Sequence, residues 1–210
     1  LLFGLILLLF TGALLEYFPG DTGPIIMQGA TVAALIIGTG GQQKNRNHLV
    51  TSIIFIVLMV LMVVAGLLID RAGFGYLHLL LLLCFLVWMT WLAVRQVLFT
   101  GSITSNDIVG AICIYMLLGL IWAILYLLLA LTTPGAFNGL PQAPWLDNFA
   151  AAVYFSFVTI TTLGCGDISP ALPVARFLVI MEAIVGVFYM AILVASLVGV
   201  RMSVRDEKNK

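Results

Sequence analysis

Long runs of hydrophobic residues alternate with short polar segments along the chain. Six runs approach or reach the length of a membrane span, and they cover residues 1–17, 24–39, 49–69, 76–97, 108–131 and 173–200. A helix rises about 1.5 Å per residue, so about 20 apolar residues cross a hydrocarbon core of about 30 Å. The runs are continuous rather than alternating, which excludes a transmembrane barrel. The pattern predicts an all-α membrane protein.

Composition indicates which solvent surrounds these helices. Hydrophobic residues make up 63% of the 210 residues, charged residues make up 9%, and the formal net charge is zero. A water-soluble domain of this length does not have such a composition, so we expect membrane lipid around the helices. The few basic residues are scattered, which argues against a nucleic-acid partner.

The distribution of Lys and Arg predicts the orientation in the membrane. With the C-terminal end inside, seven basic residues lie on the inner side and two, Arg71 and Arg176, on the outer side. Basic residues favour the cytoplasmic side. We therefore expect a multi-pass protein of the inner (plasma) membrane with both termini cytoplasmic.

Residues 132–172 interrupt the pattern on the predicted outer side. Five of the seven prolines lie at positions 134, 141, 144, 170 and 173. Residues 132–144 are polar and predict an exposed turret, whereas residues 146–161 have an apolar, helical composition but are too short to cross the bilayer and return. We expect a re-entrant helix whose C-terminal end stops inside the membrane, where its negative dipole end favours cations.

The decapeptide at residues 158–167 reads Val-Thr-Ile-Thr-Thr-Leu-Gly-Cys-Gly-Asp. Gly164 and Gly166 alternate with residues that carry side chains, and glycine adopts positive φ without steric cost. Such alternation allows successive carbonyl oxygens to face one axis. A row of these oxygens, repeated around a symmetry axis, replaces the hydration shell of a monovalent cation.

A helix, this decapeptide and a following helix together resemble the pore module of the potassium channel superfamily, whose usual filter is Thr-Val-Gly-Tyr-Gly-Asp. The resemblance covers about residues 108–200 and extends to Pro170, which follows the acidic residue, and to Arg176 near the start of the last helix. It implies potassium ions in a selectivity filter and no organic cofactor. The implied ion-binding residues are Thr162, Leu163, Gly164, Cys165 and Gly166.

Further roles follow from the same resemblance. Asp167, Tyr154, Phe155 and Thr161 would support the filter, Gly186 would be the gating hinge, and the cavity would be lined by Val187, Met190 and Val194. Leu163 in place of Val is a mild departure. Cys165 in place of Tyr is a larger one: unless Tyr154 or Phe155 fills the space, the filter is looser and discriminates less between potassium and sodium.

The resemblance divides the chain into residues 1–100, a four-helix transmembrane unit, and residues 101–200, the pore domain. Within the pore domain it implies an outer helix at 108–131, a turret at 132–144, a pore helix at 146–161, a filter at 162–167 and an inner helix at 173–200, followed by a cytoplasmic tail at 201–210. The fourth run lacks arginine at every third position and has Arg95 at its inner end. Several charges are needed for steep voltage gating, so we expect weak or no voltage dependence. A cytoplasmic regulator would lie outside residues 1–210.

One filter segment per chain predicts a homotetramer, because a closed ring of carbonyls needs four copies. The sequence thus favours a passive, potassium-selective channel that is not an enzyme. A non-selective monovalent cation channel on the same architecture is the nearest alternative. A secondary transporter or a non-conducting membrane scaffold is more remote, since a transporter would show interrupted helices in two related halves.

Two other residues have competing interpretations. Cys165 is either a small packing residue that points away from the axis or a thiol with a metal or redox role, and we favour the packing role. Glu182 lies in the apolar run 173–200, where an ionisable group has a partner. It is either a structural tie to a hydroxyl such as that of Thr159 or Ser156, or a gating residue.

Overall fold

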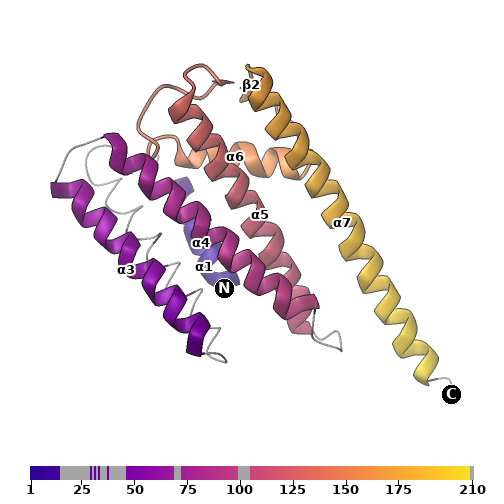
Figure 1. Cartoon of the computed structure of the whole chain (residues 1–210). Helices are drawn as coiled ribbons and strands as arrows, with labels where there is room; N and C mark the ends of the chain where they lie inside the picture. The colour runs from indigo at the N-terminus through magenta and orange to yellow at the C-terminus, as the bar shows by residue number, and fades with distance from the viewer. Residues whose placement is uncertain are drawn as a thin grey trace.

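The apolar runs fold into helices, most of which run in roughly the same direction (Figure 1). The computed structural model describes residues 1–14, 29, 31, 33, 37, 46–68, 72–98 and 105–208. Its helices are α1 (Leu2–Leu14), α3 (Arg46–Leu68), α4 (Ala72–Leu98), α5 (Ser105–Thr132), α6 (Phe149–Ile160) and α7 (Pro173–Lys208). Among the described residues, three segments are long and apolar enough to span a membrane: Gly75–Val97, Ile108–Thr132 and Pro173–Leu193.

Helices occur where the runs 49–69, 76–97, 108–131 and 173–200 predict them, and α1 covers most of the first run. The second run, 24–39, lies outside the described residues apart from single positions. Helix α7 continues to Lys208, so most of the segment predicted as a tail, 201–210, is helical.

The short helix begins later than the range 146–161 predicts. Helix α6 starts at Phe149, because the residues before it form turns in which Asp147 N–H bonds to the Pro144 carbonyl at 3.1 Å. The Asn148 side chain donates to the Pro141 carbonyl at 2.8 Å, which secures the chain just before the helix. Local hydrogen bonds of this kind compete with helix formation.

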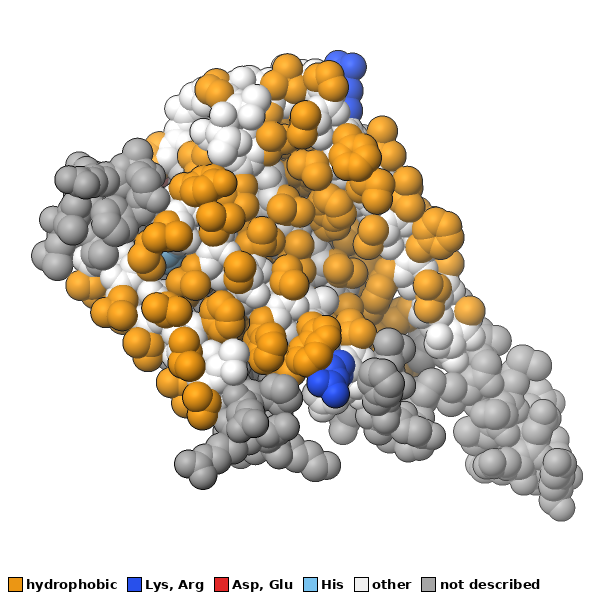
Figure 2. All heavy atoms as spheres, in the orientation of Figure 1, with side chains coloured by type: hydrophobic (Ala, Val, Ile, Leu, Met, Phe, Trp, Pro, Cys, Tyr) orange, Lys and Arg blue, Asp and Glu red, His pale blue; other side chains and the backbone are white. Residues whose placement is uncertain are grey.

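Helices α4 and α5 pack against each other at the centre of the helical layer (Figure 1). Helix α3 contacts α4, and α1 contacts α5. Leu79 and Met89 of α4 and Leu117 and Ile124 of α5 are nearly or fully buried in this core. Helix α6 lies across the direction of α5 and α7 and contacts both (Figure 1). The face drawn in Figure 2 is largely apolar, with the described basic side chains near its two ends.

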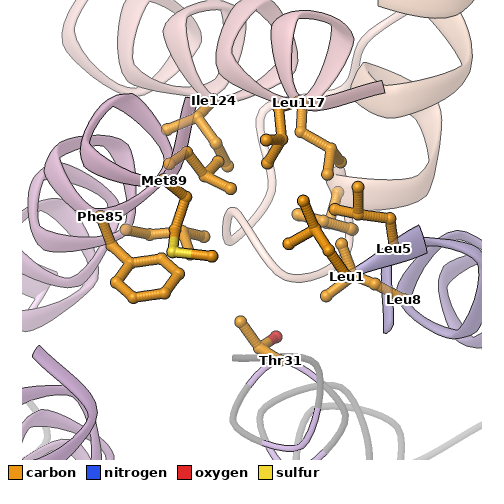
Figure 3. A pocket seen from close by; sticks show the side chains of 12 residues that line it. Leu1, Leu5, Leu8, Thr31, Phe85, Met89, Leu117 and Ile124 are labelled. Carbon is orange, nitrogen blue, oxygen red and sulfur yellow. The ribbon is translucent and has the colours of Figure 1, made fainter. Parts of the chain in front are cut away.

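An apolar pocket lies among α1, α4, α5 and α6. Leu5 and Leu8 of α1, Met89 of α4 and Leu117 of α5 point toward it, and Thr31 lies at one side (Figure 3). The pocket has a volume of about 30 Å³, and none of its lining residues comes from α7 or from residues 161–172. A site lined by hydrocarbon does not compensate an ion for lost water.

Two short strands connect the ends of the segment between α5 and α7. Strand β1 (Phe137–Asn138) pairs antiparallel with β2 (Ser169–Pro170), so that Phe137 lies opposite Pro170 and Asn138 opposite Ser169. The Asn138 side chain also donates to the Ser169 hydroxyl at 3.2 Å. The pairing holds the chain that follows residues 162–167 against the chain that follows α5.

Candidate functional site

Residues 161–167 leave the C-terminal end of α6 through a series of backbone hydrogen bonds that point back at the helix. The N–H groups of Leu163 and Gly164 both donate to the Val158 carbonyl, at 2.9 and 3.2 Å, and the Thr162 N–H donates to the Thr159 carbonyl at 2.9 Å. These bonds satisfy carbonyls that a helix end leaves without partners. They also turn the N–H groups of this segment toward α6.

The backbone of the same segment alternates in handedness. Thr162, Gly164 and Gly166 have φ angles of 60°, 61° and 85°, whereas the residues between them do not have positive φ. Positive φ at the two glycines agrees with the sequence prediction. Positive φ at Thr162 was not predicted, because a β-branched residue adopts this region rarely and at an energetic cost.

The carbonyl oxygens of this segment are available for an external ligand. Within the described part of the chain, no carbonyl from Thr162 to Gly166 accepts a hydrogen bond. Every residue from Thr161 to Asp167 is exposed, and the Leu163 side chain is 70% exposed in the single chain. Exposed carbonyls without a protein partner bind water, and where water is excluded they need an ion or a neighbouring chain as partner.

Asp167 follows the segment and is supported through its backbone. A β-carbon on Gly139 would overlap the Asp167 carbonyl and would lie 3.3 Å from Ile168 Cα. Gly139 also has a φ of 79°, so both its conformation and its neighbours require glycine. The segment after α5 therefore packs directly on the end of residues 162–167.

Tyr154 and Phe155 are adjacent in α6 but have different surroundings. Phe155 is buried against Tyr126 and Phe137, with ring centroids 5.1 and 5.8 Å apart. Tyr154 is partly exposed, and its pKa is raised to about 12, first by its interaction with the Cys165 side chain, then by partial burial and by the nearby Asp167 carboxylate. Of the two aromatic residues, Tyr154 is thus the one that lies near the Cys165 side chain.

Helix α7 approaches the end of α6 at Gly186. A β-carbon at this position would lie 2.8 Å from Ile160 Cγ1 and would overlap the Ile160 carbonyl oxygen. That same carbonyl accepts a hydrogen bond from the Tyr115 hydroxyl of α5 at 3.0 Å. The Tyr115 ring stacks on Tyr189 of α7, with centroids 5.5 Å apart. Gly186 lies within the continuous helix α7, and close packing requires glycine there.

Glu182, one turn before Gly186, is fully buried and joins three helices. Its Oε1 lies 2.5 Å from Ser156 Oγ of α6, and its Oε2 accepts a hydrogen bond from the Tyr126 hydroxyl of α5. Ser156 Oγ also lies 2.7 Å from the Gly119 carbonyl of α5. A tie between Glu182 and the Ser156 hydroxyl, one of the two that the sequence suggested, is confirmed.

The predicted cavity residues lie on α7. Val187 and Met190 are 54% and 45% exposed in the single chain. Val194 belongs to the helix, but its side chain lies outside the described residues. The Cys165 side chain is exposed and is not part of a disulfide. Among the described residues, no group of three His, Cys, Asp or Glu side chains is placed to hold a metal ion.

Sequence reasoning missed four residues that position this site: Tyr115, Tyr126, Tyr189 and Gly139. The three tyrosines lie in apolar runs, where a hydroxyl needs a hydrogen-bond partner, and this was the available signal. Tyr189 donates to the Ala111 carbonyl at 2.5 Å and so adds a second contact between α7 and α5.

Comparison with known proteins gives a family match over the part of the chain that contains these contacts. No curated protein and no solved structure gives a significant match. Residues 110–202, from the first turns of α5 into the last part of α7, match a family model whose description is "Ion channel". The match includes α6 and residues 161–167, and it supports an ion channel domain in a membrane protein whose described residues include three helices long and apolar enough to span a membrane.

Proposed function

We propose that the chain is one subunit of a potassium-selective channel and that residues 162–166 form its selectivity filter. The observation that carries the proposal is the alternation of positive φ at Thr162, Gly164 and Gly166, in a segment whose carbonyls accept no hydrogen bond within the described part of the chain. An alternating backbone presents successive carbonyl oxygens to one side. Potassium, the transported substrate, would exchange its hydration shell for these oxygens.

The dipole of α6 favours a cation at this position. The C-terminal end of the helix, at Ile160, leads directly into residues 161–167. A helix C-terminus has a partial negative charge, and in a medium of low dielectric constant it attracts cations more strongly than in water. We also propose the domain arrangement that the sequence predicts. It has a four-helix unit at 1–100 and a pore domain at 101–200, in which α6 is the re-entrant helix and Asp167 braces the filter.

A single chain supplies one row of oxygens, so the proposed working unit is a homotetramer with the filters around a four-fold axis. The exposed apolar side chains of α7 support this assembly. Phe177, Ile180, Ile184 and Val187 are all more than two-fifths exposed in the single chain. In the tetramer they would face lipid, neighbouring subunits and a central cavity that Val187 and Met190 line. The proposed orientation places both termini in the cytoplasm.

A non-selective monovalent cation channel is a second candidate, and Cys165 favours it. Its side chain is exposed in the single chain, and Tyr154 is the aromatic group that lies near it. A small side chain at this position fills less space behind the filter than tyrosine does. A filter with looser packing tolerates a smaller ion, because its oxygens are free to move inward.

Flux measurements in proteoliposomes test the proposal and separate the two candidates. The purified full chain should take up rubidium or potassium, with weak competition by sodium and block by barium. The reversal potential under opposed sodium and potassium gradients gives the permeability ratio, and a ratio near one would favour the non-selective channel.

Two controls make this measurement specific. Gly164→Ala should abolish uptake while the oligomer keeps its mass, and the mass of the wild-type oligomer should correspond to four chains. Uptake that persists in Gly164→Ala, or a wild-type protein that is monomeric in several detergents and in lipid nanodiscs, would exclude the proposed pore.

A further inference from the structure

Glu182 is a buried ionisable side chain with no described cation beside it. It is 0% exposed, and so is its partner Ser156. The basic side chains that the structure describes are engaged elsewhere: Arg95 lies over the Trp91 ring at 4.7 Å, and Arg176 donates to the Pro170 carbonyl at 3.4 Å. A carboxylate that is buried without a counter-ion is strongly destabilising, and more so inside a membrane.

The hydrogen-bond geometry gives an independent indication of the protonation state. Three oxygen–oxygen contacts form a chain: Tyr126 with Glu182 Oε2, Glu182 Oε1 with Ser156 at 2.5 Å, and Ser156 with the Gly119 carbonyl at 2.7 Å. Each contact needs one proton. The Gly119 carbonyl only accepts, and the tyrosine and serine hydroxyls supply one proton each.

The number of protons available to these three contacts distinguishes the ionised from the neutral state of Glu182. With an ionised carboxylate, two protons serve three contacts, and one pair of oxygens is left in contact without a proton between them. With a neutral carboxylic acid, Tyr126 donates to Oε2, the acid donates from Oε1 to Ser156, and Ser156 donates to the Gly119 carbonyl. All three contacts are then hydrogen bonds, and no charge is buried.

We propose that Glu182 is a permanently protonated carboxylic acid that donates a hydrogen bond to Ser156 and thereby positions α6 against α5 and α7. The position in the fold gives this bond a consequence for residues 162–167. Ser156 lies one turn before Ile160, and Glu182 lies one turn before Gly186, which packs on the Ile160 carbonyl. The protonated acid therefore sets the register between α7 and the end of α6. Glu182 acts through α6, so it is a positioning residue.

The other titratable groups around Glu182 are consistent with a neutral acid. Tyr126 and Tyr115 face it from α5. The tyrosine of α6, Tyr154, faces Cys165 and Asp167 instead. Tyrosine hydroxyls are uncharged at neutral pH, so none of these groups supplies a positive charge that would hold a carboxylate in its ionised form.

Infrared spectroscopy of the purified full chain in lipid tests the protonation state directly. A buried protonated carboxylic acid has a carbonyl stretch that is separated from the bands of carboxylates and of the peptide backbone. We expect such a band at neutral pH, its persistence when the bulk solution is made moderately alkaline, and its loss in Glu182→Gln. Asp147→Asn, at an exposed carboxyl group in the turn before α6, is the matched control and should leave the band in place.

The direction of the hydrogen bonds is testable in the same spectrum. Tyr126→Phe removes the donor to Oε2, the expected carbonyl oxygen of the acid, while it keeps the ring. We expect the band to shift to higher frequency and to remain present. Absence of a band that depends on Glu182 would overturn the proposal, and so would a band that Tyr126→Phe leaves unshifted.

A stability measurement separates the role of the proton from that of side-chain volume. The side chain in Glu182→Gln keeps one donor for Ser156 and one acceptor for Tyr126, so thermal unfolding should stay close to that of the wild-type protein. Glu182→Met keeps the approximate volume but neither hydrogen bond and should unfold at a clearly lower temperature. Equal destabilisation by both variants would contradict the proposal. These readouts need only the folded protein, so they do not depend on whether the chain conducts potassium.

Discussion

The Ile160 carbonyl at the end of α6 lies directly against Gly186 of α7, in the space that a β-carbon would occupy. The same oxygen accepts the hydrogen bond of Tyr115 from α5 at 3.0 Å. Three helices therefore meet at one backbone atom, immediately before residues 161–167. A change in either contact would move the base of the proposed filter.

Gly186→Ala tests this contact. The added methyl group would overlap backbone rather than a flexible side chain, so we expect a loss of about 1–3 kcal/mol per subunit, the usual range for overpacking. Thermal unfolding or dissociation of the oligomer measures the effect. Gly29→Ala is the control, because no atom of the described residues lies within 4 Å of a β-carbon there. Equal stability of the two variants would show that α7 is not packed on α6 in this way.

Substitution at Gly164 and Gly166 tests the alternating backbone. An L-residue with a side chain in the left-handed region costs about 1–2 kcal/mol, so Gly164→Ala and Gly166→Ala should distort the segment and reduce rubidium flux strongly. Gly135→Ala provides a matched control, since Gly135 has a φ of 76° and open space around it but lies in the segment after α5. A similar fall in flux in all three variants would mean that the effect is not specific to residues 162–166.

Gly139→Ala separates steric contact from backbone strain. Gly139 and Gly135 have nearly the same φ, 79° and 76°, but only Gly139 lies against the Asp167 carbonyl. We expect Gly139→Ala to lower the potassium-to-sodium permeability ratio and Gly135→Ala to leave it unchanged. Both variants bear a similar cost of strain, so the comparison of reversal potentials isolates the contact. Unchanged selectivity in Gly139→Ala would contradict a supporting role for this packing.

Cys165→Tyr tests whether the small side chain loosens the proposed filter. A larger ring beside Tyr154 should restrict movement of the backbone and raise the preference for potassium over sodium in reversal-potential measurements. Cys165→Ser changes little in volume and should leave selectivity as it is. A loss of selectivity or of silver sensitivity in the serine variant would instead assign a role to the thiol.

The proposed channel should respond only weakly to membrane voltage. Within the described side chains of α4, Arg95 in the last turn is the one Lys or Arg, and it lies over Trp91. One charge moved through 100 mV contributes about 2.3 kcal/mol, which is too little for steep gating. Current families recorded in planar bilayers should therefore show open probability that changes little with voltage. Gating currents equivalent to several charges per subunit would refute this.

Much of the helical architecture is predictable from local pattern. A continuous apolar run forms a helix in lipid, because an unpaired backbone amide is too costly there. The apolar runs that correspond to α3, α4, α5 and α7 therefore predict helices without any knowledge of packing. The start of α6 at Phe149 was less predictable. It depends on the hydrogen bond from Asn148 to Pro141, a contact between turns that periodicity does not encode.

The sequence by itself determined which segments are helices and where glycine permits positive φ in residues 162–166, because both follow from the chemistry of single residues and their immediate neighbours. Only the tertiary structure decided that Thr162 shares that conformation, that Phe155 packs inward while Tyr154 lies near Cys165, and that Glu182 meets Tyr126 and Ser156. These relationships join residues that are distant along the chain. Their energies depend on which helices touch and at what register, and no local pattern of hydrophobic and polar residues specifies that.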